Sequence, residues 1–197
     1  MTQHRIEIDL RNYWHPGGGR GQGMVLDASC HRNANGLPVL PGRHLKGLLR
    51  DALERAEAWG WPDYAGLAAT LFGERSEQVE NRIPQPGCLR VSDAGLPTAV
   101  VQHLGSKDGQ AMLPGLFRAL YATAVDHETG AAQDKSLRGI EVVVPLLIEA
   151  QIGPVPGREP PSDWPERLQA VLPLIDAVGA HRNRGLGRAV LKLREAA

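Results

Sequence analysis

The sequence predicts an α+β fold, and three observations carry this prediction. Apolar and charged residues alternate in the segment after Arg5 and again after Arg188, which is the period of a half-buried strand. The segment that follows Pro41 and Gly42 instead repeats its apolar residues at helical spacing. The chain has 197 residues, enough to bury a core within one domain. We therefore expect strands near both ends and helices between them to share one core.

The first half of the chain is predicted to begin with a strand and to continue into a helix. Ile6, Ile8 and Leu10 form the apolar face of the strand, and a glycine-rich loop at 17–23 and a short strand at 24–27 follow. The apolar residues of the helix fall at i, i+3, i+4, i+7, i+8 and i+11: Leu45, Leu48, Leu49, Ala52, Leu53 and Ala56. Gly60 ends this helix, because glycine disfavours a helix interior.

Three further strands are predicted after residue 87. The segments 88–92 and 140–152 have strand composition, and 140–152 is rich in valine and isoleucine. Pro145 removes one ladder donor, which favours an edge or a bulge at that point. The segment 116–125 fits either a strand or a helix, and its composition favours a strand.

A last helix and a closing strand complete the order of elements. Apolar residues recur at helical spacing from Leu168 to Val178, so this helix is expected to begin near Ser162, to bend at Pro173 and to be capped by Gly179. Strand, helix, strands, helix and strand is the βαββαβ order of a ferredoxin-like (RRM-like) domain. We expect one such domain across 1–197, with insertions around 60–87 and 95–135.

Composition limits the classes of function. Lysine plus arginine and aspartate plus glutamate number 22 each, so a site for a polyanion must be made by cations gathered on one face. The two cysteines form no CxxC pair, which argues against a disulfide framework or a cysteine-based zinc site. No segment resembles a signal peptide or is apolar enough to span a bilayer, so we expect a cytoplasmic protein that does not contact a membrane.

Two segments carry clustered cations. Arg43, Lys46 and Arg50 share one face of the first predicted helix, whose amino-terminal amide groups attract anions. The segment 179–188 combines three glycines with further cations. Glycine lets a ligand approach the backbone, and arginine binds phosphate in a bidentate manner. The candidate RNA-binding residues are Arg43, His44, Lys46, Arg50, His181, Arg182, Arg184 and Arg188.

A structural interpretation of the same residues remains open. On a solvated helix face, Arg50 would pair with Glu54 and Arg55 with Asp51. The glycine-rich segment would then be a helix cap and a tight turn into the last strand.

Four segments, taken in order, resemble motifs of the RAMP superfamily of CRISPR-associated proteins, and most of all those of the backbone subunits of type III effector complexes. Residues 36–50 resemble its PGSSLKGxxR signature, although Arg43 and His44 replace small hydroxyl residues. The remaining segments resemble an FG…GxLxVSDA stretch, a protruding hairpin and the carboxy-terminal glycine-rich loop of the superfamily: 71–73 with 87–94, 123–132, and 179–187.

The resemblance implies a subunit that binds guide RNA, stacks with like subunits into a filament and holds target RNA paired to the guide in antiviral defence. Other CRISPR-associated subunits would be its partners. In that branch, a loop aspartate before the helix start cuts target RNA with Mg²⁺ or another divalent cation, and Asp27 matches this position. Asp126 would lie in the hairpin, whereas Asp93 follows a strand and reads as a structural turn residue.

Two other functions remain open from the sequence. In the first, His31 would support metal-independent acid–base cleavage in an endoribonuclease that processes guide precursors. In the second, the chain is a structural assembly subunit without catalysis, and Asp27 only caps the end of a strand.

Overall fold

The structure is a computed structural model, and it describes residues 3–17, 27–75, 77 and 82–195. Within these residues the main sheet has four antiparallel strands in the order β2-β5-β1-β6. The strands are β1 (His4–Leu10), β2 (Leu89–Val91), β5 (Leu147–Pro154) and β6 (Ala189–Glu195). Ile8 lies opposite Ile148 on one side and Leu191 on the other. The alternation predicted for both terminal strands is therefore confirmed.

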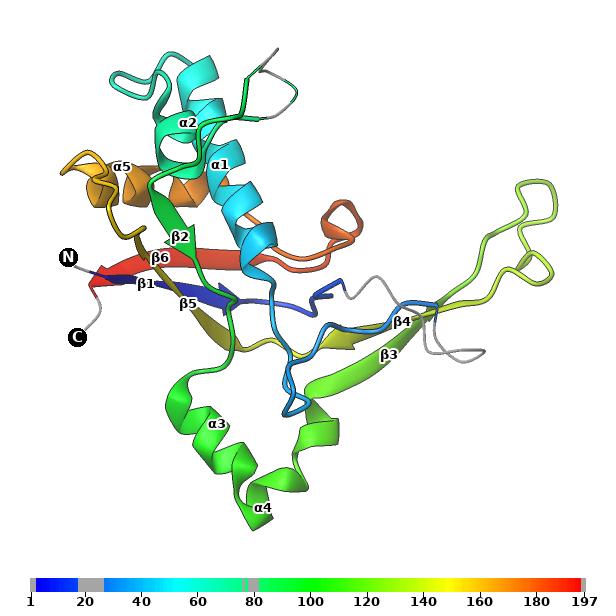
Figure 1. The fold of residues 1–197 in the computed structure, drawn as a ribbon. Coiled ribbons are helices and arrows are strands. Elements are labelled where there is room, and N and C mark those ends of the chain that lie inside the picture. Colours follow the sequence, from blue (N-terminus) through cyan, green and yellow to red (C-terminus); the bar gives the residue numbers. More distant parts are fainter. Residues whose placement is uncertain (1–2, 18–26, 76, 78–81, 196–197) are drawn as a thin grey trace.

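Three helices pack around this sheet: α1 (Gly42–Ala58), α2 (Leu67–Phe72) and α5 (Trp164–Val171) (Figure 1). The apolar stripe predicted for the first helix is buried, and Leu45, Leu49 and Leu53 are fully inaccessible to solvent. Burying each of these side chains contributes about 2 kcal/mol to folding. The start of α1 is thereby fixed with respect to the sheet.

A two-stranded hairpin projects away from the sheet (Figure 1). It consists of β3 (Phe117–Ala122) and β4 (Arg138–Val143), so the strand interpretation of 116–125 is confirmed in its main part. The predicted segment 140–152 divides around Pro145 into β4 and β5, which belong to different sheets. The break follows from the ladder donor that proline lacks.

The segment between β2 and β3 forms a separate helical projection (Figure 1). It comprises α3 (Thr98–Gly105), α4 (Lys107–Gln110) and the 3₁₀ turn η2 (Leu113–Leu116). No helix in the described ranges is long and apolar enough to cross a membrane.

The last helix is shorter than its periodicity predicts. It ends at Val171, continues as the 3₁₀ turn η3 (Leu172–Leu174) and becomes extended at Ile175. Pro173 has no N–H to donate to the carbonyl of Gln169, which stops the α-helical ladder. Gly179 is therefore not a helix cap, and this prediction was wrong. The short strand predicted at 24–27 lies outside the described residues except for Asp27, which sits in a bend.

Candidate nucleic-acid interface

The start of α1 and the glycine-rich loop, residues 179–188, meet in space. The backbone N–H of Gly179 donates a hydrogen bond of 3.0 Å to Nε2 of His44. The two segments also enclose a small cavity of about 170 Å³. Its lining residues are Gly17, Leu40, Pro41, Arg43, His44, Gly179 and Ala180. The predicted convergence of the two cationic segments is therefore present in the fold.

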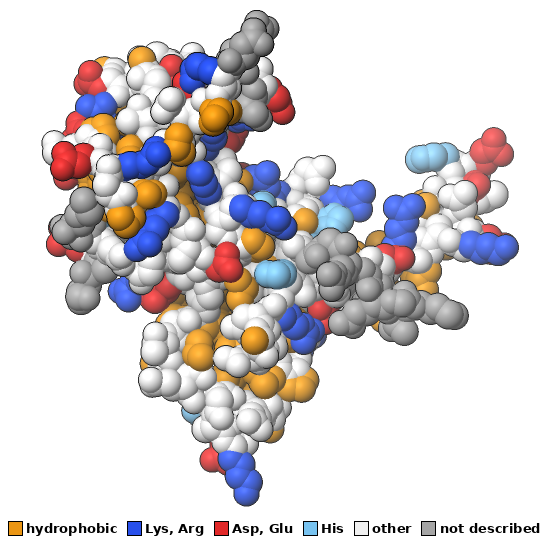
Figure 2. Space-filling view, viewed as in Figure 1, with side chains coloured by type: hydrophobic (Ala, Val, Ile, Leu, Met, Phe, Trp, Pro, Cys, Tyr) orange, Lys and Arg blue, Asp and Glu red, His pale blue; other side chains and the backbone are white. Residues whose placement is uncertain are grey.

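A larger open depression of about 570 Å³ lies beside this contact, and we call it the basic hollow. It is lined by Arg43, His44, Gly47, Leu48, Arg50, Asp51, Arg75 and Arg182. Figure 2 shows lysine and arginine side chains gathered over α1 and the glycine-rich loop on this face. Gly47 contributes no side chain, and a Cβ placed there would meet nothing within 4 Å. A chain of phosphates could therefore approach this face of the helix closely.

The glycine-rich loop owes its path to contacts within the protein. Gly179 has a φ of +86°, and a Cβ on it would lie 2.6 Å from the carbonyl oxygen of His15. Gly187 has a φ of +76°, and its Cβ would lie 1.9 Å from the carbonyl oxygen of Val178. These two glycines are required because the backbone of another segment lies against them. Close approach of a ligand, the reason proposed from sequence, is not needed to explain them.

The cations of the basic hollow differ in their partners. Arg50 forms an ion pair of 2.7 Å with Glu54, and Arg75 forms one of 2.5 Å with the same carboxylate. By contrast, the guanidinium groups of Arg43 and Arg182 have no hydrogen bond or ion pair with any residue that the structure describes. The structural interpretation thus applies to Arg50, and also to Arg55, which pairs with Asp51 at 3.2 Å.

His44 is half-buried between the two segments. Burial lowers the pKa of its imidazole, and the positive charge of Arg182 lowers it further. His44 is therefore neutral at physiological pH, in agreement with the hydrogen bond that Nε2 accepts from Gly179.

The amino terminus of α1 is partly closed to anions. The N–H of Gly42 donates to Oδ1 of Asp93 at 2.7 Å, so this amide at the helix start, where an external anion was expected, is already bonded to a carboxylate of the protein. Asp93 serves as a structural partner of the helix start, as its turn position suggested. The carbonyl oxygen of Pro41 accepts the N–H groups of His44 and Leu45. Side chains, more than helix amides, therefore provide the positive potential here.

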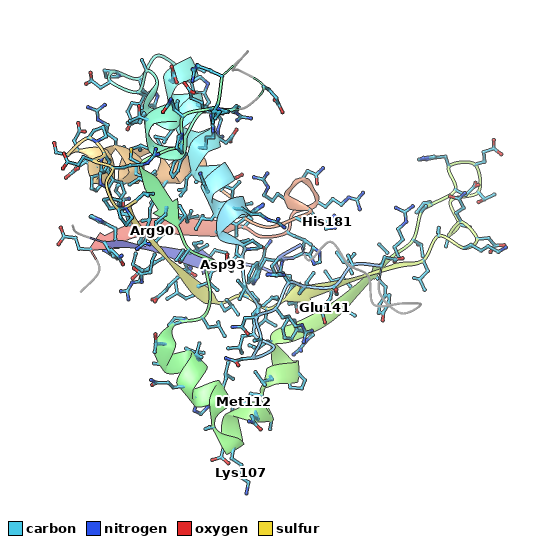
Figure 3. All side chains as sticks on the ribbon, in the orientation of Figure 1. Arg90, Asp93, Lys107, Met112, Glu141 and His181 are labelled. Atoms are coloured by element: carbon cyan, nitrogen blue, oxygen red, sulfur yellow. The ribbon has the colours of Figure 1, made fainter. Side chains whose placement is uncertain are left out.

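The other predicted RNA-binding residues are distributed around the hollow. His181 lies at the glycine-rich loop (Figure 3), and its ring centroid is 5.7 Å from that of His15. Arg184 is exposed in a 3₁₀ turn of the same loop, and Lys46 lies on α1 outside the lining of the hollow. Arg188 lines a different cavity of about 670 Å³ together with Arg11 and other residues.

Asp27 lies beside the hairpin. Its N–H donates to the carbonyl oxygen of Gly139, and its Oδ2 accepts the N–H of Gly139, both at 2.8 Å. The exposed carboxylate keeps Oδ1 uncommitted to other described residues. Mg²⁺ binds through one or two carboxylates, with waters and substrate phosphates as its other ligands, so this oxygen fits one position of such a site. No group of three or more metal-ligating side chains occurs in the described part of the chain.

Two other polar residues from the sequence analysis have local structural contacts. His31 donates its backbone N–H to the carbonyl oxygen of Pro16 at 2.7 Å. Asp126 shapes the tip of the hairpin, where Oδ1 accepts the N–H groups of Glu128 and Thr129. These hydrogen bonds from Thr129 and Glu128 lower the pKa of Asp126.

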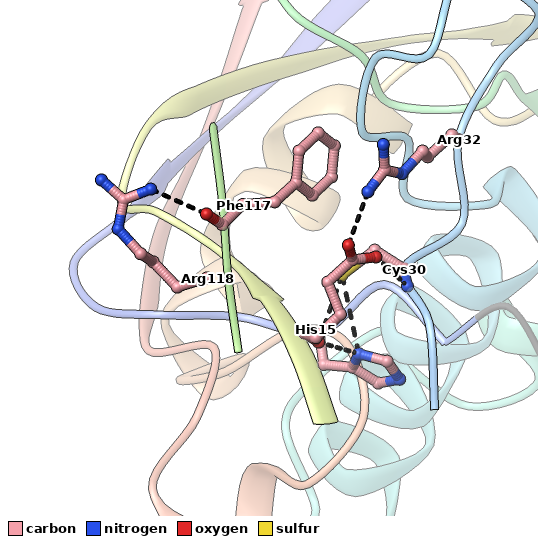
Figure 4. A network of polar contacts seen from close by, with 6 residues as sticks. His15, Cys30, Arg32, Phe117 and Arg118 are labelled. Atoms are coloured by element: carbon pink, nitrogen blue, oxygen red, sulfur yellow. Dashed lines mark hydrogen bonds and ion pairs between the residues drawn. The ribbon is translucent and has the colours of Figure 1, made fainter. Parts of the chain in front are cut away.

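Sequence reasoning missed a polar network in which Arg32 pairs with a buried carboxylate, and we call it the Glu141 cluster: His15, Cys30, Arg32 and Glu141 (Figure 4). Oε1 of Glu141 pairs with Arg32 at 2.6 Å, and Oε2 accepts the N–H of Cys30 at 2.9 Å. Nδ1 of His15 donates to the backbone oxygen of Glu141 at 2.7 Å. The available signal was a carboxylate directly before the valine run 142–144 of a predicted strand.

The Glu141 cluster contains no activated nucleophile among its four residues. Burial, together with the negative charge of Glu141, raises the pKa of the Cys30 thiol to about 12. Burial also lowers the pKa of His15, although the hydrogen bond to the Glu141 backbone opposes this change. The guanidinium of Arg32 stacks on the ring of Phe117, 3.6 Å from its centroid. A protonated thiol and a paired arginine fit a structural role at the base of the hairpin.

A family model described as the RAMP superfamily matches residues 7–190. The chain belongs to the RAMP superfamily. This confirms the resemblance carried by the four sequence segments. No protein with a curated description matches this RAMP protein at a significant level.

Solved structures share the fold of this RAMP protein. A chain of the type III-B Cmr-beta complex bound to cognate target RNA has a TM-score of 0.72 at 10% identity, with 98% of this chain and 97% of that chain covered. A chain of Cmr-beta in the apo state has a TM-score of 0.70 at 11% identity, with 98% of this chain and 97% of that chain covered. A chain of a type IV-B CRISPR complex has a TM-score of 0.59 at 14% identity, with 97% of this chain and 90% of that chain covered. At such identities the similarity shows the fold alone.

Proposed function

We propose that this RAMP protein is a guide-RNA-binding backbone subunit of a type III-like CRISPR effector complex. The observation that carries the proposal is the meeting of α1 and the glycine-rich loop in the basic hollow. The guanidinium groups of Arg43 and Arg182, which have no partner in the described part of the chain, offer bidentate donors for phosphate there. The similar fold of a chain from a complex solved with cognate target RNA supports the choice of ligand.

The charge distribution fits a subunit that acts within an assembly. The chain has no net charge, so few unpaired cations are available for a phosphate chain at one hollow. Several like subunits along one guide would add such weak contacts into a high total affinity. We therefore propose a filament of like subunits, with a target RNA and other CRISPR-associated subunits as further partners.

The proposed fold of the core is ferredoxin-like. When α2, the α3–α4 projection and the hairpin are set aside, β1, α1, β2, β5, α5 and β6 occur in the order strand, helix, strand, strand, helix and strand. In the sheet order β2-β5-β1-β6, the first strand of the chain, β1, is central and the last strand, β6, lies at an edge beside it. On this proposal, the hairpin and the α3–α4 projection are insertions into one domain.

Removal of two loop cations tests RNA binding. We expect Arg182→Ala with Arg184→Ala to weaken binding of a single-stranded RNA and to lower the slope of log affinity against log salt by roughly 1 to 1.5, because each phosphate contact on a single strand contributes about 0.7. Fluorescence anisotropy of a labelled RNA across a salt series measures both quantities.

A matched control removes two cations elsewhere. Lys192→Ala with Arg194→Ala deletes the same charge from exposed positions of β6, away from the hollow. This control is expected to keep most of the affinity and of the salt slope. An equal loss in both double variants would show only a general charge effect and would contradict the assignment of the hollow.

We also propose cleavage of target RNA at Asp27 as a second function. The observation in its favour is an exposed aspartate whose Oδ2 is held in place by Gly139, while Oδ1 has no partner among the described residues. A divalent cation held there would supply charge stabilisation for the scissile phosphate and an activated nucleophile. The protein itself would hold the carboxylate in position through the two Gly139 hydrogen bonds.

Cleavage is tested with the protein loaded with guide RNA and a complementary target. We expect Mg²⁺-dependent cleavage that Asp27→Asn abolishes while binding persists, since asparagine can still accept the Gly139 N–H. Asp108→Asn, an exposed change in α4, serves as the control. Cleavage that survives a chelator and is lost with His31→Ala would instead support the metal-independent endoribonuclease. An absence of cleavage in the loaded protein would leave a structural subunit.

A further inference from the structure

We infer that His44 is a positioning residue which, in its neutral form, latches the glycine-rich loop onto α1, so that RNA binding at the basic hollow weakens in acid. The inference rests on the proposed function, because it concerns the same site. It differs from the sequence expectation for His44, which placed this side chain among the groups that contact RNA directly.

The latch is one hydrogen bond with a defined direction. The N–H of Gly179 donates to Nε2 of His44 at 3.0 Å, so Nε2 must carry a lone pair and the proton of the neutral ring resides on Nδ1. The adjoining residue of the loop is fixed independently, because Ala180 donates its N–H to the carbonyl oxygen of His15 at 2.8 Å. His44 thus joins the loop to α1, and His15 joins it to the segment after β1.

Protonation would open the latch. An imidazolium has N–H groups on both nitrogens, so Nε2 could no longer accept the hydrogen bond from Gly179, and two N–H groups would point at each other. The loop would then separate from α1 at the residue that leads to Arg182. Because Arg182 from the loop and Arg43 from α1 line the same hollow, the spacing between their guanidinium groups would change.

Among the described residues, the surroundings of His44 provide no carboxylate that is not already paired with an arginine. Arg43, Arg50 and Arg75 line the same hollow as His44, together with Arg182 from the loop. Asp51 is the acidic residue of the lining, and its carboxylate pairs with Arg55 at 3.2 Å. Glu54 is shared by Arg50 and Arg75. In the second cavity that His44 lines, Arg43 is again the charged neighbour.

The direction of the pH effect follows from these contacts. Burial, and then Arg182, lowers the pKa of His44 below its ordinary value of about 6.5. The latched form is therefore fully stabilised above that ordinary value and is lost as the pH falls through the lowered pKa. A histidine that contacted phosphate directly would behave in the opposite way, since its imidazolium would strengthen binding in acid.

The experiment measures the affinity for a labelled oligouridine at constant ionic strength from about pH 7.5 to about pH 4.5, a range that extends well below the ordinary histidine pKa. We expect the wild type to weaken about fivefold more than His44→Gln over this range, the factor that corresponds to loss of one hydrogen bond. Glutamine offers an amide oxygen to the Gly179 N–H and does not titrate. His44→Ala, which has no acceptor, should bind about fivefold more weakly than His44→Gln already at neutral pH.

The difference between wild type and His44→Gln cancels the pH effects of every other group, because all other residues are common to both proteins. Equal pH profiles of the two proteins, or tighter binding by the wild type in acid, would overturn the latch while leaving RNA binding intact. No RNA binding at neutral pH would instead refute the proposed function.

Hydrogen exchange provides a readout that needs no RNA. Relative to His44→Gln at the same pH, amides of the segment 179–188 in the wild type should lose protection as the solution becomes acidic. The latch is contradicted if the two proteins keep equal protection of this segment throughout the pH range.

Discussion

The basic hollow and the Glu141 cluster contain similar side chains, but these side chains are paired in the cluster, whereas some of them are available to a ligand in the hollow. Both contain arginine, histidine and a carboxylate, and both lie next to the segment that carries His15. In the Glu141 cluster, Arg32 has a carboxylate at 2.6 Å and an aromatic ring beneath it, so its binding capacity is used within the fold. In the hollow, Arg43 and Arg182 have no such partner among the described residues. The partners of an arginine, more than its neighbours in sequence, indicate whether it is available to a ligand.

His15 connects the two regions. Its carbonyl oxygen accepts the N–H of Ala180 in the glycine-rich loop, and its ring donates to the backbone of Glu141 in β4. The loop and the base of the hairpin therefore share one support. Changes that remove this support should affect both regions, whereas changes within one region should leave the other in place.

The largest effect is expected from Gly187→Ala. A methyl group at this position would lie 1.9 Å from the carbonyl oxygen of Val178, and the backbone φ of +76° is unfavourable for alanine. We expect the free energy of unfolding to fall by at least about 3 kcal/mol, because backbone strain and overpacking add. Urea unfolding followed by circular dichroism measures this change.

Gly185→Ala is the matched control in the same loop. Its φ is +82°, but a Cβ there meets nothing within 4 Å. We expect a loss of only about 1 kcal/mol from the left-handed conformation. Similar losses in the two variants would show that steric contact with Val178 does not determine the path of the loop.

The second effect concerns the Glu141 cluster. Glu141→Ala leaves Arg32 without its carboxylate and the Cys30 N–H without an acceptor. We expect a loss of about 2 kcal/mol, below the range for a fully buried pair because the Arg32 side chain is 35% exposed. Urea unfolding reports the loss, and RNA affinity at neutral pH should stay within about twofold, since no residue of the cluster lines the hollow.

Two further variants complete a double-mutant cycle for the ion pair between Arg32 and Glu141. Arg32→Met removes the positive charge, and the double variant with Glu141→Ala removes the pair. The double variant should be less destabilised than the sum of the single ones, because it leaves no unpaired charge. Strict additivity would show that the ion pair does not stabilise the base of the hairpin.

The sequence predicted the core well and the long-range contacts poorly, for physical reasons. The alternation around Ile8 and the stripe around Leu49 report burial directly, so both elements were correct. The helix expected to continue to Val178 failed because periodicity does not register the missing N–H of Pro173. Sequence patterns of charge located the two cationic segments, although the family resemblance was needed to give them a function.

The contacts that define the candidate site join residues far apart in the chain. His44 and Gly179 are separated by 135 positions, and no local pattern announces their hydrogen bond. The same holds for Glu141, whose partner Arg32 lies 109 positions away. The sequence showed the glycines of the loop but not why glycine is needed there. The carbonyl groups that lie against Gly179 and Gly187 belong to other segments, so the sequence analysis attributed these glycines to close approach of a ligand.

The smallest expected effect separates two arginines on the same face of α1. Arg43→Ala removes a guanidinium with no partner among the described residues, so RNA affinity should fall about fivefold with little change in unfolding. Arg50→Ala removes a guanidinium already paired with Glu54, so affinity should fall less than twofold. Anisotropy at low salt measures both affinities, and urea unfolding checks both folds. A larger loss of affinity for Arg50→Ala would mean that the RNA displaces Glu54 from its pair, and the contrast between paired and unpaired arginines would no longer identify the binding surface.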